Sequence, residues 1–169
     1  VCDMMQDRLG ANALPIQLPI GKEDTFRGII DLVSMKAEIY YSDDGTDIRE
    51  EAIPEDMLHQ AKEQRSKLLD AIIDEDETFM ERYFAGEWFT AEELIPLIRK
   101  ATLSGRVVPV VCGSSYRNKG VQPLINAIVD YLPSPLDVPS AKGTSKDGTK
   151  ELTVEPDDDG PFAALAFKI

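Results

Sequence analysis

The stretch Val110-Val-Cys-Gly-Ser-Ser-Tyr-Arg-Asn-Lys-Gly-Val-Gln122 joins an apolar run to an amphipathic helix. The run ends at Cys112, a turn of small and polar residues follows, and Gly120 opens the helix. Ligands of open α/β sheets bind beyond the carboxyl ends of the strands. A turn of small residues at that place exposes backbone N–H groups, which can meet an anion or the carbonyl oxygen of a base. The pattern predicts an α/β protein with a ligand-contacting turn.

The elements on either side of this turn form a βα unit. Residues 106–112 are almost continuously apolar, which is typical of a strand covered on both faces in a parallel sheet. Pro109 places that strand at an edge of the sheet. The following helix is expected to pack back on the sheet through an apolar stripe. The stripe consists of Val121, Leu124, Ile125, Ile128, Val129 and Leu132.

The first half of the chain predicts an α+β region with short strands. A helix ends near Leu9, with Gly10 just after its last turn. Residues 14–20 alternate apolar and polar, and two prolines make them an edge strand. Further strands are expected at residues 26–32, 35–41 and 47–53, with a turn at residues 43–45.

Three helices are expected before the βα unit. Pro54 followed by two acidic residues begins the longest. Residues 77–84 form a second, and Thr90 with Glu93 predicts a capping box for the third, in which Pro96 produces a kink or marks the true start. The apolar stripe of the long helix consists of Met57, Ala61, Leu68, Leu69, Ile72 and Ile73.

The segment after residue 133 predicts little regular structure. Residues 133–139 are rich in proline and begin an extended linker, and residues 140–160 are expected to be exposed loop. Residues 162–169 have the pattern of a strand but precede no possible partner. We interpret them as the first strand of a further domain.

Composition restricts the function. The 169 residues are 43% hydrophobic and 29% charged, as in an ordinary globular protein. The net charge is −13, from 18 basic and 31 acidic residues, which argues against direct, general binding of nucleic acid. Cys2 and Cys112 do not suggest a disulfide framework, and the chain has neither an 18-residue apolar window nor a signal peptide. A cytoplasmic protein is expected, and the missing initiator methionine suggests a processed or excised piece.

Four blocks of sequence, in order, resemble bacterial elongation factor G, the GTPase that drives translocation on the ribosome. They are Arg8-Leu-Gly-Ala-Asn12 with Pro15-Ile-Gln-Leu-Pro-Ile-Gly21, the turn with its flanks at residues 112–122, Asp130-Tyr-Leu-Pro-Ser-Pro-Leu-Asp-Val-Pro139, and Pro161-Phe-Ala-Ala-Leu-Ala-Phe-Lys-Ile169. The resemblance implies a helix of the GTP-binding domain at residues 1–12 and the inserted G′ subdomain at residues 13–105. The last strand and helix of the GTP-binding domain would be residues 106–133, followed by a linker at 134–160 and the first strand of domain II at 161–169.

The resemblance assigns two sites. Ser114, Ser115 and Tyr116 match the turn that closes over guanine and offers backbone N–H to its O6 oxygen; the family's usual middle residue is alanine. The insert is implicated in docking the basic C-terminal domain of the ribosomal stalk protein. Acidic residues on the long helix suit that partner: Glu55, Asp56, Glu63, Asp70 and Asp74.

The parent of such a chain binds GTP or GDP with Mg²⁺, acts on the ribosome and has no membrane partner. This chain has no Gly-x-x-x-x-Gly-Lys-[Ser/Thr] loop to hold the phosphates. We therefore expect the chain alone to be inactive and to bind no nucleotide or metal. The alternatives are a part of a ribosomal protection protein or of a peptide-release GTPase, or a non-enzymatic acidic adaptor for a ribosomal protein. An adaptor should have a closed core, whereas a part of a GTPase should leave residues 107–111 and 121–132 partly uncovered.

Other polar residues have simpler interpretations. His59 has no neighbouring ligand cluster, and Cys112 is interpreted as a buried small hydrophobe. Residues 74–77 lack the spacing of a calcium loop and are interpreted as solvated. Trp88 and Phe89, which precede the capping box, are expected in a hydrophobic staple or the core. The acidic helix face could serve solubility alone.

Overall fold

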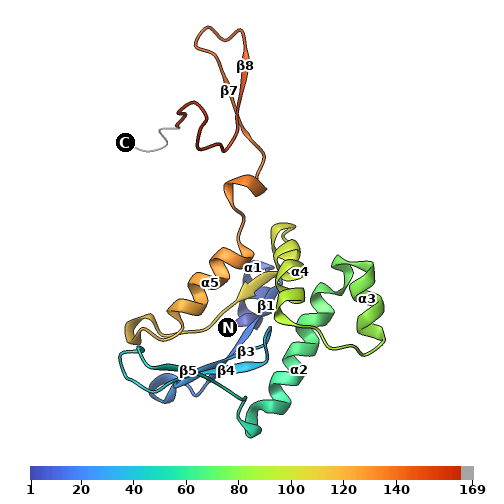
Figure 1. The fold of residues 1–169 in the computed structure, drawn as a ribbon, viewed down its shortest axis with the longest axis vertical. Coiled ribbons are helices and arrows are strands. Elements are labelled where there is room, and N and C mark those ends of the chain that lie inside the picture. The colour runs from blue at the N-terminus through green and yellow to red at the C-terminus, as the bar shows by residue number, and fades with distance from the viewer. Residues whose placement is uncertain (165–169) are drawn as a thin grey trace. The chain divides into compact units, whose positions relative to one another are not determined.

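The computed structural model describes residues 1–164 and has the predicted mixed α/β character (Figure 1). The chain divides into two compact units, Val1–Leu132 and Pro133–Ile169. The helices of the first unit are α1 (Cys2–Leu9), α2 (Glu55–Ile72), α3 (Glu77–Phe84), α4 (Ala91–Leu103) and α5 (Val121–Tyr131). Its strands are β1 (Ala13–Pro15), β2 (Gln17–Ile20), β3 (Gly28–Asp31), β4 (Lys36–Tyr40), β5 (Ile48–Glu51) and β6 (Val108–Val110). Short 3-10 helices are η1 (Glu23–Thr25), η2 (Ile73–Glu75) and η3 (Ser115–Arg117).

The first unit contains two sheets, and the chain passes from one to the other at Ile16. Strands β2-β3-β4-β5 form an antiparallel sheet in sequence order, and β1 pairs in parallel with β6. The Ile16 N–H donates to the carbonyl of Val110, while its carbonyl accepts from Leu32 N–H, both at 3.0 Å. The prediction of one strand over residues 14–20 was therefore wrong, because one residue bonds to both sheets. Both halves lie at sheet edges, as their prolines predict.

The antiparallel sheet is apolar on both faces. On one face, Ile30 and Ala37 pack into the main core with α2 and α4. The opposite face carries a smaller cluster of Phe26, Ile29 and Tyr40, against which Cys112 packs. Because paired residues of an antiparallel sheet share a face, the register also determines which polar residues lie beside this second cluster.

Helix α2 begins after Pro54, as predicted. Of the predicted apolar stripe, Ala61, Leu68 and Ile72 are buried, and the other three residues are partly buried against the core. The helix also buries Arg65, which the stripe did not reveal. The Arg65 guanidinium donates hydrogen bonds to the carbonyl oxygens of Leu32, Val33 and Phe89, at 2.6 to 2.7 Å. Burial lowers the pKa of Arg65. The side chain thus joins α2 to the segment after β3 and to the segment before α4.

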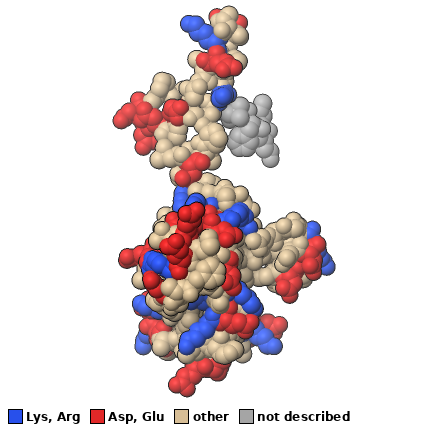
Figure 2. All heavy atoms as spheres, turned by 90° about the vertical axis from the view of Figure 1, so that its right-hand side faces the viewer, with Lys and Arg blue, Asp and Glu red and all other residues tan. Residues whose placement is uncertain are grey.

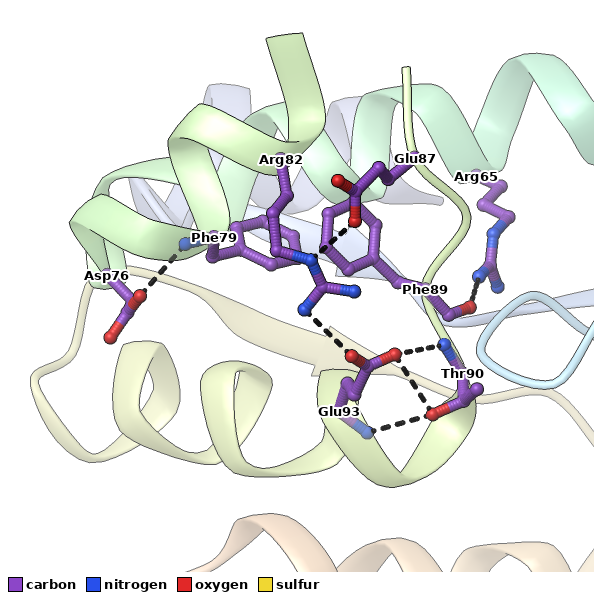
Figure 3. Close-up of polar contacts among 8 residues, drawn as sticks. All are labelled: Arg65, Asp76, Phe79, Arg82, Glu87, Phe89, Thr90 and Glu93. Carbon is purple, nitrogen blue, oxygen red and sulfur yellow. Dashed lines mark hydrogen bonds and ion pairs between the residues drawn. The ribbon is translucent and has the colours of Figure 1, made fainter. Parts of the chain in front are cut away.

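The predicted capping box opens α4 (Figure 3). Glu93 Oε2 accepts from Thr90 N–H at 2.8 Å, and Glu93 N–H donates to Thr90 Oγ1 at 3.4 Å. Arg82 of α3 forms ion pairs with Glu87 and Glu93, both at 2.8 Å. Pro96 lies inside the helix, so it does not mark the start. The capping box therefore defines the start of α4, and its Glu93 also joins α4 to α3.

Aromatic residues before the box have separate roles. Phe89 is buried in the core and lies 4.2 Å from Phe79 between ring centroids. Trp88 is 63% exposed, and its ring lies 4.3 Å from the guanidinium carbon of Arg65. The core interpretation thus holds for Phe89 but not for Trp88.

The prediction of a solvated loop at residues 74–77 was wrong for Glu75. Glu75 is buried, and its carboxylate pairs with Arg106, whose Nε lies 2.9 Å away, and with Lys100 at 3.8 Å. Asp76 caps α3 by accepting from Phe79 N–H at 2.9 Å. Two cations from distant parts of the sequence make the burial of Glu75 possible, which local composition does not indicate.

The predicted strand and helix of the βα unit both form. Helix α5, however, packs on the core with a different side from the one predicted. Val108 in β6 is 42% exposed, so the strand is not covered on both faces. Ala127 and Tyr131 of α5 pack on the core. The predicted inward stripe faces out instead, and its exposed members are Leu124, Ile125, Ile128, Val129 and Leu132. Only one of the two helix faces finds a partner in this unit.

The second unit contains a hairpin where an exposed loop was expected. After η4 (Pro135–Asp137), strands β7 (Ala141–Thr144) and β8 (Glu151–Val154) pair antiparallel. Gly148, with φ +70°, and the bond from Ser145 N–H to the Lys150 carbonyl shape the turn between them. The loop prediction missed this hairpin because most of its residues are polar and exposed. Of the strand expected at residues 162–169, positions 162–164 have no regular structure and the rest lies outside the described residues.

No helix in residues 1–164 combines the length and the apolar character needed to cross a bilayer.

Candidate functional site

The turn between β6 and α5 is a closed loop. Ser114 N–H donates to the Lys119 carbonyl at 2.7 Å, and Lys119 N–H donates to the Ser114 carbonyl at 3.0 Å. Gly120 forms the predicted entry to α5 with φ +84°, and a Cβ there would lie 2.7 Å from the Cys112 carbonyl oxygen. A Cβ on Gly113 would lie 2.8 Å from the Lys119 oxygen. Glycine at both positions allows the two arms of the loop to approach this closely.

The predicted site residues Ser114, Ser115 and Tyr116 lie at the tip of this loop, around η3. The Ser114 and Ser115 carbonyls accept from Arg117 and Asn118, both at 3.1 Å. The N–H groups of Ser115 and Tyr116 have no acceptor in the part of the chain that the structure describes, as expected for the first residues of a helical turn. Tyr116 is 99% exposed. The turn therefore presents two adjacent backbone donors to solvent.

A hollow of about 210 Å³ adjoins Ser115, the first of these two residues, whereas Tyr116 does not line it. Ser114, Ser115, Lys119 and Gly120 line it on the side of the turn, and Leu124 lines it on the side of α5. Lys119 is 5% exposed and forms no ion pair with any described residue. Lys119 was not among the predicted site residues, yet it lines the hollow next to Ser114 and Ser115.

Residues of the antiparallel sheet and of its connecting loops form hydrogen bonds and an ion pair with the turn. The Tyr40 hydroxyl accepts a hydrogen bond from Gly120 N–H at 2.7 Å in a buried position. Asp24 pairs with Arg117 at 2.8 Å, and Asn118 Nδ2 donates to the Asp44 carbonyl at 3.2 Å. These partners lie at least 74 residues away in the sequence. No local pattern could have revealed them, although the turn at residues 43–45 was predicted.

Gly45 makes the tightest of these approaches. It has φ +69°, and a Cβ at this position would lie 2.3 Å from the Asn118 carbonyl oxygen. The β4–β5 loop therefore packs directly against the backbone of the turn. A side chain at residue 45 would push the two apart.

Cys112 begins the turn two residues after β6 ends, rather than inside a strand. Its N–H donates to Gln17 Oε1 at 3.2 Å, and its side chain packs on the smaller apolar cluster. Burial raises the pKa of the Cys112 thiol to about 11. A neutral thiol is a weak nucleophile. Cys112 was expected to be a buried small hydrophobe; it is partly buried and packs on the smaller cluster.

The acidic residues of the second predicted site are all exposed. They are Glu55, Asp56, Glu63, Asp70 and Asp74. Asp56, Glu63 and Asp70 follow one another at intervals of seven and share the outer side of α2. Two of these three have partners, because Glu63 pairs with Lys67 at 2.7 Å and Asp70 accepts from the Tyr83 hydroxyl at 2.6 Å. Figure 2 shows acidic and basic side chains interspersed over the face turned to the viewer.

His59 is exposed on the same side of α2. Across residues 1–164, no three or more His, Cys, Asp and Glu side chains form a group that could hold a metal ion.

No protein-family model matches the chain. Among solved structures, it is similar to the crystal structure of a protein from Thermus thermophilus, with 32% sequence identity and a TM-score of 0.66. The match covers 80% of this chain and 20% of that chain. The chain thus spans about a fifth of the length of that protein.

Proposed function

We propose that the chain is one section of a translational GTPase of the elongation factor G type, whose complete form binds and hydrolyses GTP on the ribosome during elongation. In this proposal Ser114, Ser115 and Tyr116 contact guanine through their backbone. Hydrolysis of GTP depends on groups that position the phosphates, Mg²⁺ and the attacking water. The sequence of this chain contains no phosphate loop. The chain on its own is therefore expected to be inactive.

One observation supports this proposal above the others: the two free N–H groups at the tip of the turn. They follow the carboxyl end of β6, a parallel strand, which is where α/β sheets place their ligands. Backbone donors recognise a carbonyl oxygen whatever the side chains are. Serine at position 115 in place of the family's usual alanine is therefore compatible with the role.

The open face of the βα unit supports a section of a larger domain over a free-standing adaptor. Val108 and the outer stripe of α5 are exposed, with Val129 at 72%. Contiguous exposed apolar surface of this kind marks a place where another element packs. A larger parallel sheet with its own helices would cover β6 and this side of α5.

A matched pair of substitutions tests the guanine contact in the complete gene product. Ser115→Pro removes the N–H while fitting the first position of a helical turn, and Ser114 has the extended backbone that a following proline requires. Ser115→Ala keeps the N–H and removes only the hydroxyl. We expect Ser115→Pro to weaken GDP binding about tenfold, the loss of one hydrogen bond, and Ser115→Ala to leave it unchanged. Equal affinity of the two variants, measured by calorimetry, would refute the contact.

The same gene product distinguishes the remaining alternatives. An upstream phosphate loop in its reading frame eliminates the adaptor. A part of a ribosomal protection protein or of a peptide-release GTPase would share the turn but differ in the sequence around residues 1–169, and in whether the protein drives translocation.

We also propose that the acidic side of α2 docks the basic C-terminal domain of the ribosomal stalk protein. Its acidic side chains are exposed, and Asp56 carries an uncompensated charge, with no partner in residues 1–164. Complementary charge speeds association and weakens with salt. Binding of the isolated stalk domain should therefore fall steeply as salt rises and should weaken in Asp56→Asn. Absence of binding at low salt would contradict this docking.

A further inference from the structure

A second pocket of about 150 Å³ lies between the antiparallel sheet and α5, on the side of α5 that faces inward. Its polar lining consists of Gln17, Asp31, Glu38, Asn126, Asp130 and Tyr131. None of these residues belongs to the guanine turn or to the acidic side of α2. The pocket is therefore a separate feature of the first unit.

The sheet register brings three of these residues together. Gln17 pairs with Asp31, and Ile29, two residues before Asp31, pairs with Glu38. Because paired residues and residues two apart share a face, Gln17, Asp31 and Glu38 all lie on the face of the smaller apolar cluster. Asn126 and Asp130, one helical turn apart, approach from α5.

Two of the three carboxylates that line this pocket, Glu38 and Asp130, have no paired cation among residues 1–164. Asp31 accepts from Val33 N–H and from the Ser34 hydroxyl, which occupy its oxygens locally. The side chains of Glu38 and Asp130 have no hydrogen-bond or ion-pair partner among residues 1–164. Burial, followed by the charges of Asp31 and Glu50, raises the pKa of Glu38. Two carboxylates without a cation therefore share one small cavity.

Tyr131 completes the pocket. It is 5% exposed, and its hydroxyl has no partner in the described part of the chain. Every fully buried side-chain oxygen or nitrogen in that part has a partner, so the hydroxyl oxygen is not fully buried. Tyr131 lines the pocket together with Asp31 and Asp130, whose charges act on its hydroxyl. Burial, then the charges of Asp31 and Asp130, raises the pKa of Tyr131, which keeps the hydroxyl protonated. A buried tyrosine usually finds a partner for its hydroxyl, and here a ligand can supply it.

We propose that this pocket binds a compact organic cation, a guanidinium or primary ammonium group, held by Glu38 and Asp130 with the Tyr131 hydroxyl accepting a further N–H. Such cations form short, charge-assisted hydrogen bonds to carboxylates. The small volume suits a head group with a short alkyl tail and excludes a folded segment of chain. Bare metal ions fit less well, because the described residues contain no group of ligands suited to one.

The 169-residue chain itself can be tested by NMR titration, with propylguanidinium as the probe and propylurea, which has a similar shape and no charge, as the control. We expect amide shifts at Asn126, Asp130 and Tyr131 with a millimolar dissociation constant for propylguanidinium, and none for propylurea. Equal shifts with both probes, or equal shifts with potassium chloride at the same concentration, would overturn the proposal. Absence of shifts at these amides would also overturn it.

Substitutions in the pocket then test which side chains contact propylguanidinium. Asp130→Asn and Tyr131→Phe keep the shape of the pocket, and each should weaken propylguanidinium binding several-fold. Glu38→Gln provides a third test should one of them unfold, which the spread of the amide spectrum reports. Asp7→Asn, at an exposed position of α1, removes the same charge far from the pocket in the sequence and should leave propylguanidinium binding unchanged. Equal loss in Asp7→Asn would show a general charge effect and contradict the site.

A short peptide, acetyl-Gly-Arg-Gly-amide, distinguishes the two sources of such a cation. Tighter binding than propylguanidinium at the same amides indicates an arginine side chain of a protein partner. Equal binding indicates a free small cation. Both outcomes support the pocket, whereas failure of the peptide and of propylguanidinium together refutes it.

Discussion

At the scale of single residues, the conformation of the candidate turn depends on a hydroxyl from a strand far away in the sequence. Tyr40 accepts the Gly120 N–H in a buried position, so Tyr40→Phe leaves that donor unpaired. An unsatisfied buried group costs about 1–3 kcal/mol. We expect urea unfolding to show a loss in that range and the Gly120 amide to exchange its hydrogen faster.

Tyr41→Phe is the matched control. The Tyr41 side chain is exposed and its hydroxyl donates to Glu51 at the surface, so its loss should cost about 0.5 kcal/mol or less. Equal losses of unfolding free energy in the two variants would show that the hydrogen bond to Gly120 contributes no more to stability than the surface bond does.

Gly45 offers a second test of the contact between loop and turn. Gly45→Ala combines a left-handed backbone with a Cβ 2.3 Å from the Asn118 oxygen. Gly86→Ala has the same kind of backbone, with φ +76°, but open space around it. We expect about 1 kcal/mol for Gly86→Ala, from the backbone alone, and clearly more for Gly45→Ala. The prediction fails if thermal unfolding shows the same loss of stability for both variants.

The Cys112 thiol makes stability depend on pH. Burial raises its pKa from 9.0 to about 11, so between these values the unfolded thiol has ionised and the folded one has not. Stability from this group is complete below about pH 9 and is lost as pH rises toward about 11. The difference in unfolding free energy between the wild type and Cys112→Ala should therefore shrink over this range. A difference that is constant with pH would contradict the burial of the thiol, and Cys2→Ala controls for removal of a thiol as such.

At the scale of elements, helix α5 has an inner face that packs and an outer apolar face that does not. Ile125 and Val129 are 55% and 72% exposed. Replacing both with glutamine should change the unfolding free energy by about 0.5 kcal/mol or less per site and reduce self-association in light scattering. Ala127→Gln, on the packed face, should destabilise the chain by more. Severe destabilisation by the outer pair would mean that this face is packed after all.

Local sequence signals predicted the elements better than their partners. The Thr90–Glu93 box and the glycine after α1 were read correctly, because capping involves residues within one turn. The strand at residues 14–20 was read as one element, because nothing local shows that Ile16 bonds to two sheets. The stripe on α5 was assigned to the inside, because periodicity identifies an apolar face but not what covers it.

In the candidate site, too, local sequence predicted the element but not its distant partners. The turn and its glycines could be located from residue types alone. Its supports at Asp24, Tyr40 and Asp44 could not, because each acts across at least 74 residues of sequence. Burial of Glu75 and Arg65 was missed for a related reason: their partners come from other elements.

At the scale of the whole molecule, the proposed guanine contact comes without a phosphate loop in this sequence. Residues 1–169 alone should therefore neither hydrolyse GTP nor bind it measurably. Equilibrium dialysis of the purified chain against labelled GTP checks this. A micromolar affinity would require a phosphate site that the account lacks.

Competition for a fluorescent GDP on the complete gene product tests whether the turn recognises guanine. Recognition by the backbone donors at Ser115 and Tyr116 requires an acceptor at position 6 of the purine, which guanine has and adenine lacks. We expect GDP to displace the probe and ADP at the same concentration not to. Equal displacement by ADP, or failure of the gene product to bind GDP at all, would contradict it.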